Sequence, residues 1–199
     1  MNFLNDFLFL LPEIYVSFFS ILILLFGTWL RNQSFNIFVI NLGYVFVFCL
    51  IIVLCILYYT PLDFCALSYQ YNSTFLISLI KIFFICILLL SVLVSLNYFF
   101  VEKIFFIEYY FFLGLLIISA FFLMSSNDFI LFYFSLELQA LILYTLAALK
   151  RFTAFSSESG LKYFVLGAFS SGLILFGFSL LYGFLGISNF FDLKFIFLK

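Results

Sequence analysis

The chain alternates between long apolar runs and short polar breaks, a pattern typical of a protein that crosses a membrane repeatedly. A helix needs about 20 apolar residues to span a bilayer, and six runs are long enough. They cover residues 7–30, 36–59, 75–97, 105–125, 129–149 and 158–185. The runs are continuously apolar, whereas the strands of a membrane β-barrel alternate. We therefore predict an all-α, polytopic membrane bundle of about six transmembrane helices, forming a single domain over residues 1–199.

Basic residues in the loops predict the orientation of this bundle. Those on one side of the membrane are Arg31, Lys103, Lys150 and Arg151, against Lys194 and Lys199 on the other side. The positive-inside rule then places the first, third and fifth loops inside and the amino terminus outside. The amino terminus lacks the basic residue and the small-residue cleavage site of a signal peptide.

Composition supports the membrane assignment and limits the chemistry. Of the 199 residues, 68% are hydrophobic and 9% are charged, whereas about a quarter of a soluble domain is charged. The net charge of −1 gives no reason to expect a nucleic-acid partner. There is no His, and the four Cys form no CxxC pair, so we expect no metal or cofactor site in this chain. The 36 Phe residues indicate AT-rich codons, as in an organellar genome.

A single carboxylate, Glu137, lies near the centre of the fifth apolar run. At about 1.5 Å per residue, it is roughly 13 Å from Asp128 and about 20 Å from Lys150, which is membrane depth from either side. An ionised Glu there is unfavourable by about 3 kcal/mol or more. Helical spacing places Tyr133 and Tyr144 on the same face. Glu137 is therefore either an ion- or proton-handling group or a neutral residue that packs helices by hydrogen bonding.

The sixth run carries a second charge, Lys162, close to its start. It follows Glu158 by four residues, so one alternative is a surface ion pair between the two. The other alternative is an ammonium that points into the bundle. The fifth and sixth spans should be antiparallel neighbours, which leaves a vertical gap of roughly 12 Å between Glu137 and Lys162. Water or another charged group would have to link them.

Three further charged residues lie near the ends of predicted spans and are secondary candidates. Lys81 lies about a turn and a half into the third span, where it either lines a polar path or snorkels to the outer surface. We expect snorkelling. Glu13 and Glu108 begin the first and fourth spans, and we expect both at the membrane interface.

Several motifs resemble subunit 2 of mitochondrial NADH:ubiquinone oxidoreductase, respiratory complex I. They occupy residues 125–128 (SSND), 133–139 (YFSLELQ), 146–150 (LAALK) and 158–172 (ESGLKYFVLGAFSSG), with 10–14 (LLPEI) in keeping. The resemblance implies the amino-terminal part of an antiporter-like fold and a proton-translocating role. It implies that Glu137 and Lys162 belong to a chain of charged groups and water at the bilayer centre, and that Lys162 points toward it. From their positions in the sequence, we add Tyr133, Tyr144, Lys81 and Glu108 as possible supporting residues.

The resemblance also implies partners and a location. The chain would belong to the membrane arm in the mitochondrial inner membrane, with its amino terminus in the intermembrane space. NADH, FMN, iron–sulfur clusters and ubiquinone would be bound by other subunits. Family members have about fourteen helices, including broken seventh and twelfth helices, so we expect a separate chain to supply helices seven onward. The alternatives are a stand-alone cation/proton antiporter component and a structural remnant in the membrane arm.

Overall fold

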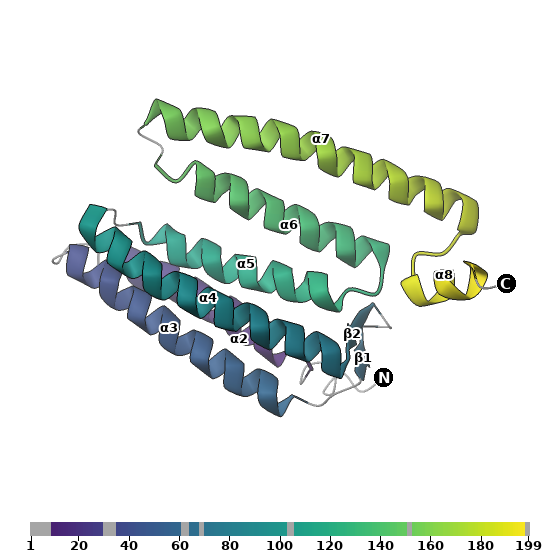
Figure 1. Cartoon of the computed structure of the whole chain (residues 1–199), viewed down its shortest axis with the longest axis horizontal. Coiled ribbons are helices and arrows are strands. Elements are labelled where there is room, and N and C mark those ends of the chain that lie inside the picture. The colour runs from purple at the N-terminus through teal and green to yellow at the C-terminus, as the bar shows by residue number, and fades with distance from the viewer. Residues whose placement is uncertain are drawn as a thin grey trace. The chain divides into compact units, whose positions relative to one another are not determined.

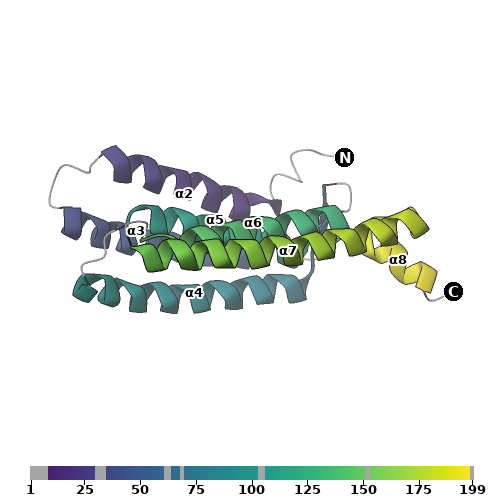
Figure 2. The same ribbon diagram turned by 90° about the horizontal axis from the view of Figure 1, so that it is seen from above.

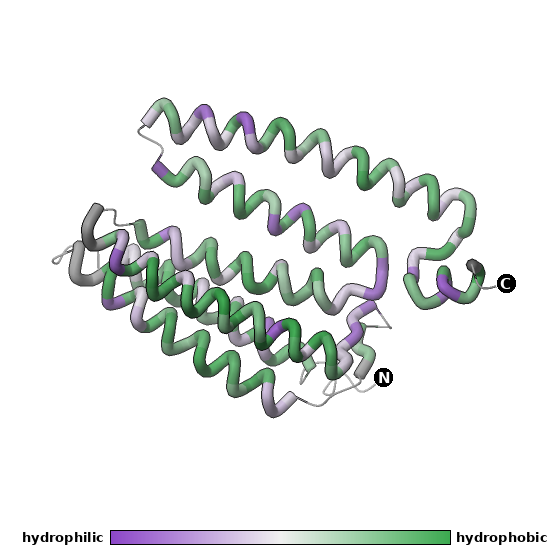
Figure 3. The backbone as a smooth tube through the Cα atoms, viewed as in Figure 1, coloured by the Kyte–Doolittle hydropathy of each residue, from purple (hydrophilic) through white to green (hydrophobic). Residues whose placement is uncertain are grey.

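The computed structural model describes residues 9–29, 35–60, 64–67, 70–102, 106–150 and 153–197. Six long helices follow one another along the chain (Figure 1). They are α2 (Leu11–Trp29), α3 (Phe35–Tyr59), α4 (Phe75–Glu102), α5 (Glu108–Ser125), α6 (Phe129–Ala147) and α7 (Ala154–Leu185). All six are long and apolar enough to cross a membrane, and Figure 3 shows polar residues mainly at their ends. The predicted fold class is confirmed. Of the basic loop residues, Arg31, Lys103, Arg151 and Lys199 lie outside the described residues.

The chain divides into two compact units. The first comprises Met1–Phe64 and Ser73–Ile118, and the second comprises Cys65–Asn72 and Ser119–Lys199. Helix α5 contributes its first part to unit 1 and its last part to unit 2.

Unit 1 is built around α3, which packs against both α2 and α4. Its core consists of branched and aromatic side chains, among them Val39, Phe46, Leu50, Val53, Ile85, Val92, Tyr110 and Ile117. Small residues allow α5 to approach α2, because a Cβ on Gly114 would lie 2.6 Å from the Cβ of Ser20. Membrane helices rely on such close contacts, since apolar burial between helices brings no gain over lipid.

Unit 2 is built on the antiparallel pair α6 and α7, which run along one another (Figures 1 and 2). At one end of the pair, four aromatic rings meet around Phe129 and Phe132 of α6, with Phe178 of α7 and Phe190 of α8. At the other end, the Ser156 hydroxyl donates to the carbonyl of Ala147 at 3.0 Å. The pair is therefore fixed at both ends.

Three elements of the structure are not predicted by the apolar pattern. The strands β1 (Phe64–Ala66) and β2 (Tyr71–Ser73) form a short pair between α3 and α4, and α8 (Phe190–Phe197) follows α7. The start of α7 also differs, because the helix begins at Ala154 with Thr153 as its N-cap, four residues before the predicted start at 158. At its other end, Gly186 adopts a left-handed conformation with φ 67°, and its N–H donates to the Tyr182 carbonyl at 2.8 Å. Glycine suits this position because it has no Cβ to clash.

Candidate functional site

Glu137 lies in the middle of α6, which runs from Phe129 to Ala147. At about 1.5 Å per residue, the carboxylate is about 12 Å along the helix from the first of these residues and about 15 Å from the last. Helix α6 has 19 residues. Its length of roughly 29 Å is barely the thickness of the hydrocarbon core. Glu137 therefore lies near the middle of a helix whose length is close to the thickness of the core.

The Glu137 side chain lines a cavity of about 430 Å³ between α6 and α7. The other lining residues are Phe129, Ile130, Tyr133, Phe134, Leu175, Phe178, Ser179, Tyr182 and Ser188. The Oε2 atom of Glu137 is buried and has no hydrogen-bond partner among the described residues. A buried carboxyl oxygen without a donor is unfavourable by a few kcal/mol. A donor from a group outside the described residues would remove this cost.

The two tyrosines predicted on the face of Glu137 have different surroundings. Tyr133 lines the same cavity as Glu137. Tyr144 is buried, and its ring packs edge-on against Tyr163 and Phe164 of α7. Gly167 lies directly opposite the Tyr144 hydroxyl, so a side chain there would overlap it. Tyr144 therefore joins α6 to α7, while Tyr133 shares the cavity with the carboxyl group.

Lys162 adopts the surface pair rather than the expected inward position. Its Nζ lies 2.6 Å from Glu158 Oε1, and the two side chains are 71% and 58% exposed. The physical reason is that the i,i+4 spacing offers a local partner, whereas Glu137 lies too far along the bundle. Gly160 lies against Ala148, which makes Lys162 level with the end of α6. The distance from there to Glu137 along the helix axis is about 15 Å. Glu137 and Lys162 are therefore separated along the helix axis, as the sequence predicts.

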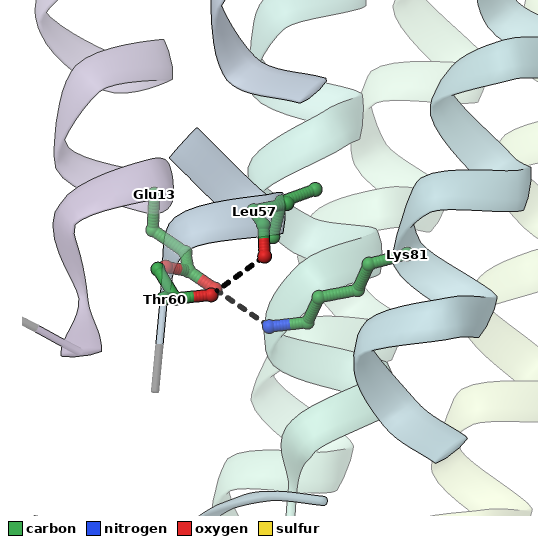
Figure 4. A network of polar contacts seen from close by, with 4 residues as sticks. All are labelled: Glu13, Leu57, Thr60 and Lys81. Atoms are coloured by element: carbon green, nitrogen blue, oxygen red, sulfur yellow. Dashed lines mark hydrogen bonds and ion pairs between the residues drawn. The ribbon is translucent and has the colours of Figure 1, made fainter. Parts of the chain in front are cut away.

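The prediction that Lys81 snorkels to the surface is wrong, because Lys81 is buried against Glu13. Lys81 Nζ donates to Glu13 Oε1 at 2.8 Å, and only 3% and 2% of the two side chains are exposed (Figure 4). Glu13 is 68 residues from Lys81 in sequence, so no local pattern reveals the pair. A usable signal was the antiparallel order of the spans, which brings the starts of α2 and α4 to the same end. Glu108 is the first residue of α5 and is exposed.

A polar junction at the start of α6 was missed by sequence reasoning. Asp128 is 4% exposed, and its Oδ2 accepts a hydrogen bond from Gln70 Nε2 at 3.3 Å. Asn127 Nδ2 donates to Asn189 Oδ1 at 3.1 Å, and the Asn127 backbone N–H donates to the Gln70 carbonyl at 2.8 Å. The SSND motif is therefore a buried connector of three segments rather than an exposed loop.

Groups of three or more potential metal ligands are absent from the described ranges of the chain. The cysteines there are unpaired thiols: Cys49 is buried, while Cys55, Cys65 and Cys86 are exposed.

The carboxyl half of the chain matches a known protein family. Residues 126–198 match the family described as NADH:quinone oxidoreductase/Mrp antiporter, transmembrane. This region contains α6, α7 and α8, and with them Glu137 and Lys162.

Two relatives extend the similarity over nearly the whole chain. The chain is 41% identical over 186 residues to NADH-quinone oxidoreductase subunit N of Pelagibacter ubique, which covers 92% of this chain and 38% of that protein. It is 37% identical over 201 residues to NADH-ubiquinone oxidoreductase chain 2 of Marchantia polymorpha, which covers 97% of this chain and 40% of that protein. The chain thus spans about two fifths of the length of these relatives.

Two solved structures share the fold. One belongs to respiratory complex I from Thermus thermophilus with bound aureothin, with a TM-score of 0.65, 23% identity, and 89% of this chain and 38% of that chain covered. The other belongs to the membrane-bound sulfane sulfur reductase, an archaeal respiratory membrane complex, with a TM-score of 0.61, 21% identity, and coverage of 94% and 38%. Taken with the sequence relatives, these matches lead to one assignment: the chain belongs to the family of NADH-quinone oxidoreductase subunit N and NADH-ubiquinone oxidoreductase chain 2.

Proposed function

We propose that this chain is part of a proton-translocating membrane-arm subunit of a respiratory NADH:quinone oxidoreductase, and that Glu137 belongs to its proton path. The observation that carries the proposal is the Glu137 carboxyl group, which lies mid-helix with a buried oxygen that has no donor among the described residues. The names of the relatives supply the type of enzyme.

The surroundings of Glu137 favour proton handling over packing. A glutamate that only joins helices would be neutral, with its oxygens satisfied by neighbouring hydroxyl groups. Glu137 Oε2 has no such neighbour in the described chain, although Tyr133 lines the same cavity. Intramembrane carboxyl groups that line a cavity are typical of ion and proton pathways.

Lys162 is the second charge that we assign to the path. Its pair with Glu158 is exposed, and exposed i,i+4 pairs contribute only about 0.3–0.5 kcal/mol. Breaking this pair would therefore cost little free energy if Lys162 turned toward another partner. The gap of about 15 Å to Glu137 requires water or a further charged group between them.

We further propose that the later helices of the fold pack against α6 and α7 and bring a basic residue to Glu137. The relatives are about two and a half times as long as this chain. Gly172 and Gly177 of α7 have open space where a Cβ would lie, and small residues suit close helix contacts. A separate polypeptide supplying these helices fits the expectation drawn from the sequence.

The location and activity follow from the same assignment. The Marchantia relative is a chain of an NADH-ubiquinone oxidoreductase, which supports a place in the mitochondrial inner membrane. The distribution of basic loop residues supports an amino terminus in the intermembrane space. The enzyme activity, NADH:ubiquinone reductase coupled to proton transport, belongs to the whole complex. NADH, FMN, the iron–sulfur clusters and ubiquinone are bound by its other subunits.

Gentle isolation of the tagged chain tests this proposal against a stand-alone cation/proton antiporter. We expect the chain to co-purify with NADH dehydrogenase activity in one large assembly. Recovery of a small assembly that exchanges cations for protons without NADH oxidation would contradict the proposal. A structural remnant would co-purify as well, and substitution of Glu137 separates it from a proton-translocating subunit.

A further inference from the structure

The Glu13–Lys81 ion pair has no place in the proton path proposed above. The two side chains are 2% and 3% exposed, and Nζ lies 2.8 Å from Oε1. By contrast, the Lys162–Glu158 pair is mostly exposed. A charge is expensive to bury in a membrane protein and is kept only where it has a task, so this pair requires an explanation of its own.

The pair links two helices at one end of unit 1. Glu13 lies in the first turn of α2 and Lys81 in the second turn of α4. Helix α3 packs against both of these helices, and its end lies beside the pair, where Thr60 donates to the Leu57 carbonyl at 2.9 Å (Figure 4). The ion pair thus closes the group of three helices by joining α2 directly to α4.

Membrane helices need such a link because apolar side chains are as well solvated by lipid as by one another. Helix α2 is almost entirely apolar beyond its first turn, and Phe18, Ile21, Leu25 and Phe26 are exposed. Apart from the close approach of Ser20 to Gly114, sliding or rotating α2 would exchange one apolar contact for another. Separating Glu13 from Lys81 would instead leave two charges in a low dielectric, which is strongly unfavourable. The pair therefore selects one register of α2 against α4.

The hydrogen bonds of the hydroxyl groups near the pair argue against a role in proton conduction. Ser17 and Ser20 continue the buried face of α2 below Glu13, and each donates at 2.8 Å to a carbonyl of its own helix, Ile14 and Ser17 respectively. Thr60 does the same on α3. Among the described residues, these three hydroxyl protons are therefore donated to backbone carbonyls and not to Glu13 or Lys81.

We propose that Glu13 and Lys81 form an electrostatic clamp that fixes the register of α2 against α4, and that both residues stay charged and paired throughout turnover. The clamp is a property of this chain alone and does not depend on the proposed function.

The test compares Glu13→Gln, Lys81→Met, the double variant and the charge swap E13K/K81E in native membranes. The first readout is the amount of protease-resistant chain that remains after heating. Each single change strands a buried charge, so we expect a loss of resistant chain of several-fold. The double variant and the swap should recover most of that loss. Thr60→Val is the matched control at the same end of the bundle and should behave like the wild type.

The second readout separates a clamp from a proton site. Where variant chains remain in an assembled, NADH-oxidising complex, the number of protons moved per NADH should equal the wild-type value. A double variant no more resistant than the worse single variant would overturn the clamp, and so would a loss in Thr60→Val as large as in the single variants. A reduced proton-to-NADH ratio in a fully assembled double variant would likewise overturn it, because the pair would then take part in transport. Failure of the chain to co-purify with NADH oxidation would instead count against the proposed function and leave the first readout intact.

Discussion

Two carboxyl groups in this chain differ in whether a cation lies beside them. Glu13 has a lysine ammonium at 2.8 Å, while Glu137 has a buried Oε2 without a donor among the described residues and faces a largely apolar cavity. The ammonium gives Glu13 a fixed partner, whereas Glu137 lines a cavity. This difference supports the structural role proposed for Glu13 and the transport role proposed for Glu137.

Substitution of Lys162 should separate its transport role from its surface pair. Lys162→Met removes a charge of the proposed path, so we expect a several-fold lower rate of NADH-driven proton uptake with normal assembly. Glu158→Gln removes only the surface partner, and an exposed pair contributes about 0.3–0.5 kcal/mol, so this control should behave like the wild type. Equal effects of the two changes on proton uptake would indicate that the surface pair itself is what matters.

For single residues, the sequence predicted features that depend on positions along one helix and missed those that depend on contacts between helices. The depth of Glu137 depends only on positions along one helix, and the Lys162–Glu158 alternative depends only on i,i+4 spacing. The partner of Lys81 depends on how α2 and α4 meet in space, and the apolar pattern carries no information about that. Snorkelling was the natural expectation for a lysine whose buried partner is so distant along the chain.

At the scale of elements, the α6–α7 pair is held by close contacts of small residues. Gly160 fits against Ala148, where a Cβ would lie 2.7 Å from the alanine Cβ, and Gly167 fits against the Tyr144 hydroxyl. Further along α7, a Cβ added to Gly172 would have no atom within 4 Å. One helix therefore offers both a tightly packed glycine and a matched control.

Gly167→Ala should weaken the α6–α7 interface, because the added methyl group overlaps the buried Tyr144 ring. Overpacking of this kind destabilises by about 1–3 kcal/mol. Thermal unfolding of the chain in detergent would measure the loss, with Gly172→Ala as the control. Comparable losses for both glycines would show that helix propensity or lipid contact, and not packing on Tyr144, sets the effect.

The six spans were predictable because each is a long uninterrupted apolar run, and a run of that length has few alternatives to a membrane helix. The strands β1 and β2 have three residues each, too few to show a periodic pattern. Helix α8 has eight residues, and its apolar character merges with that of its surroundings. The early start of α7 reflects the tie between Ser156 and the Ala147 carbonyl, a tertiary contact that the apolar pattern does not show.

For the whole molecule, the orientation in the membrane is the property with most consequence for the direction of proton flow. The predicted orientation places the α3–α4 segment, with exposed Cys65, on the intermembrane-space side. A membrane-impermeant maleimide added to mitoplasts should therefore label Cys65. Cysteine introduced in place of Lys150, which is exposed after α6, should be labelled only after permeabilisation. Labelling of Cys65 only after permeabilisation, with labelling of the cysteine at position 150 before it, would show that the orientation is the opposite one.

The chain spans about two fifths of the length of its relatives, so its activity has to be measured in the complete assembly. The central claim is that protons pass by way of Glu137. The most direct measurement is the number of protons moved per NADH oxidised in membranes that carry Glu137→Gln, which keeps the shape of the side chain and removes its charge. We predict normal assembly with a lower ratio, and a milder loss for Glu137→Asp, which keeps the charge and shortens the reach. A fully assembled Glu137→Gln complex with the wild-type ratio would contradict the claim.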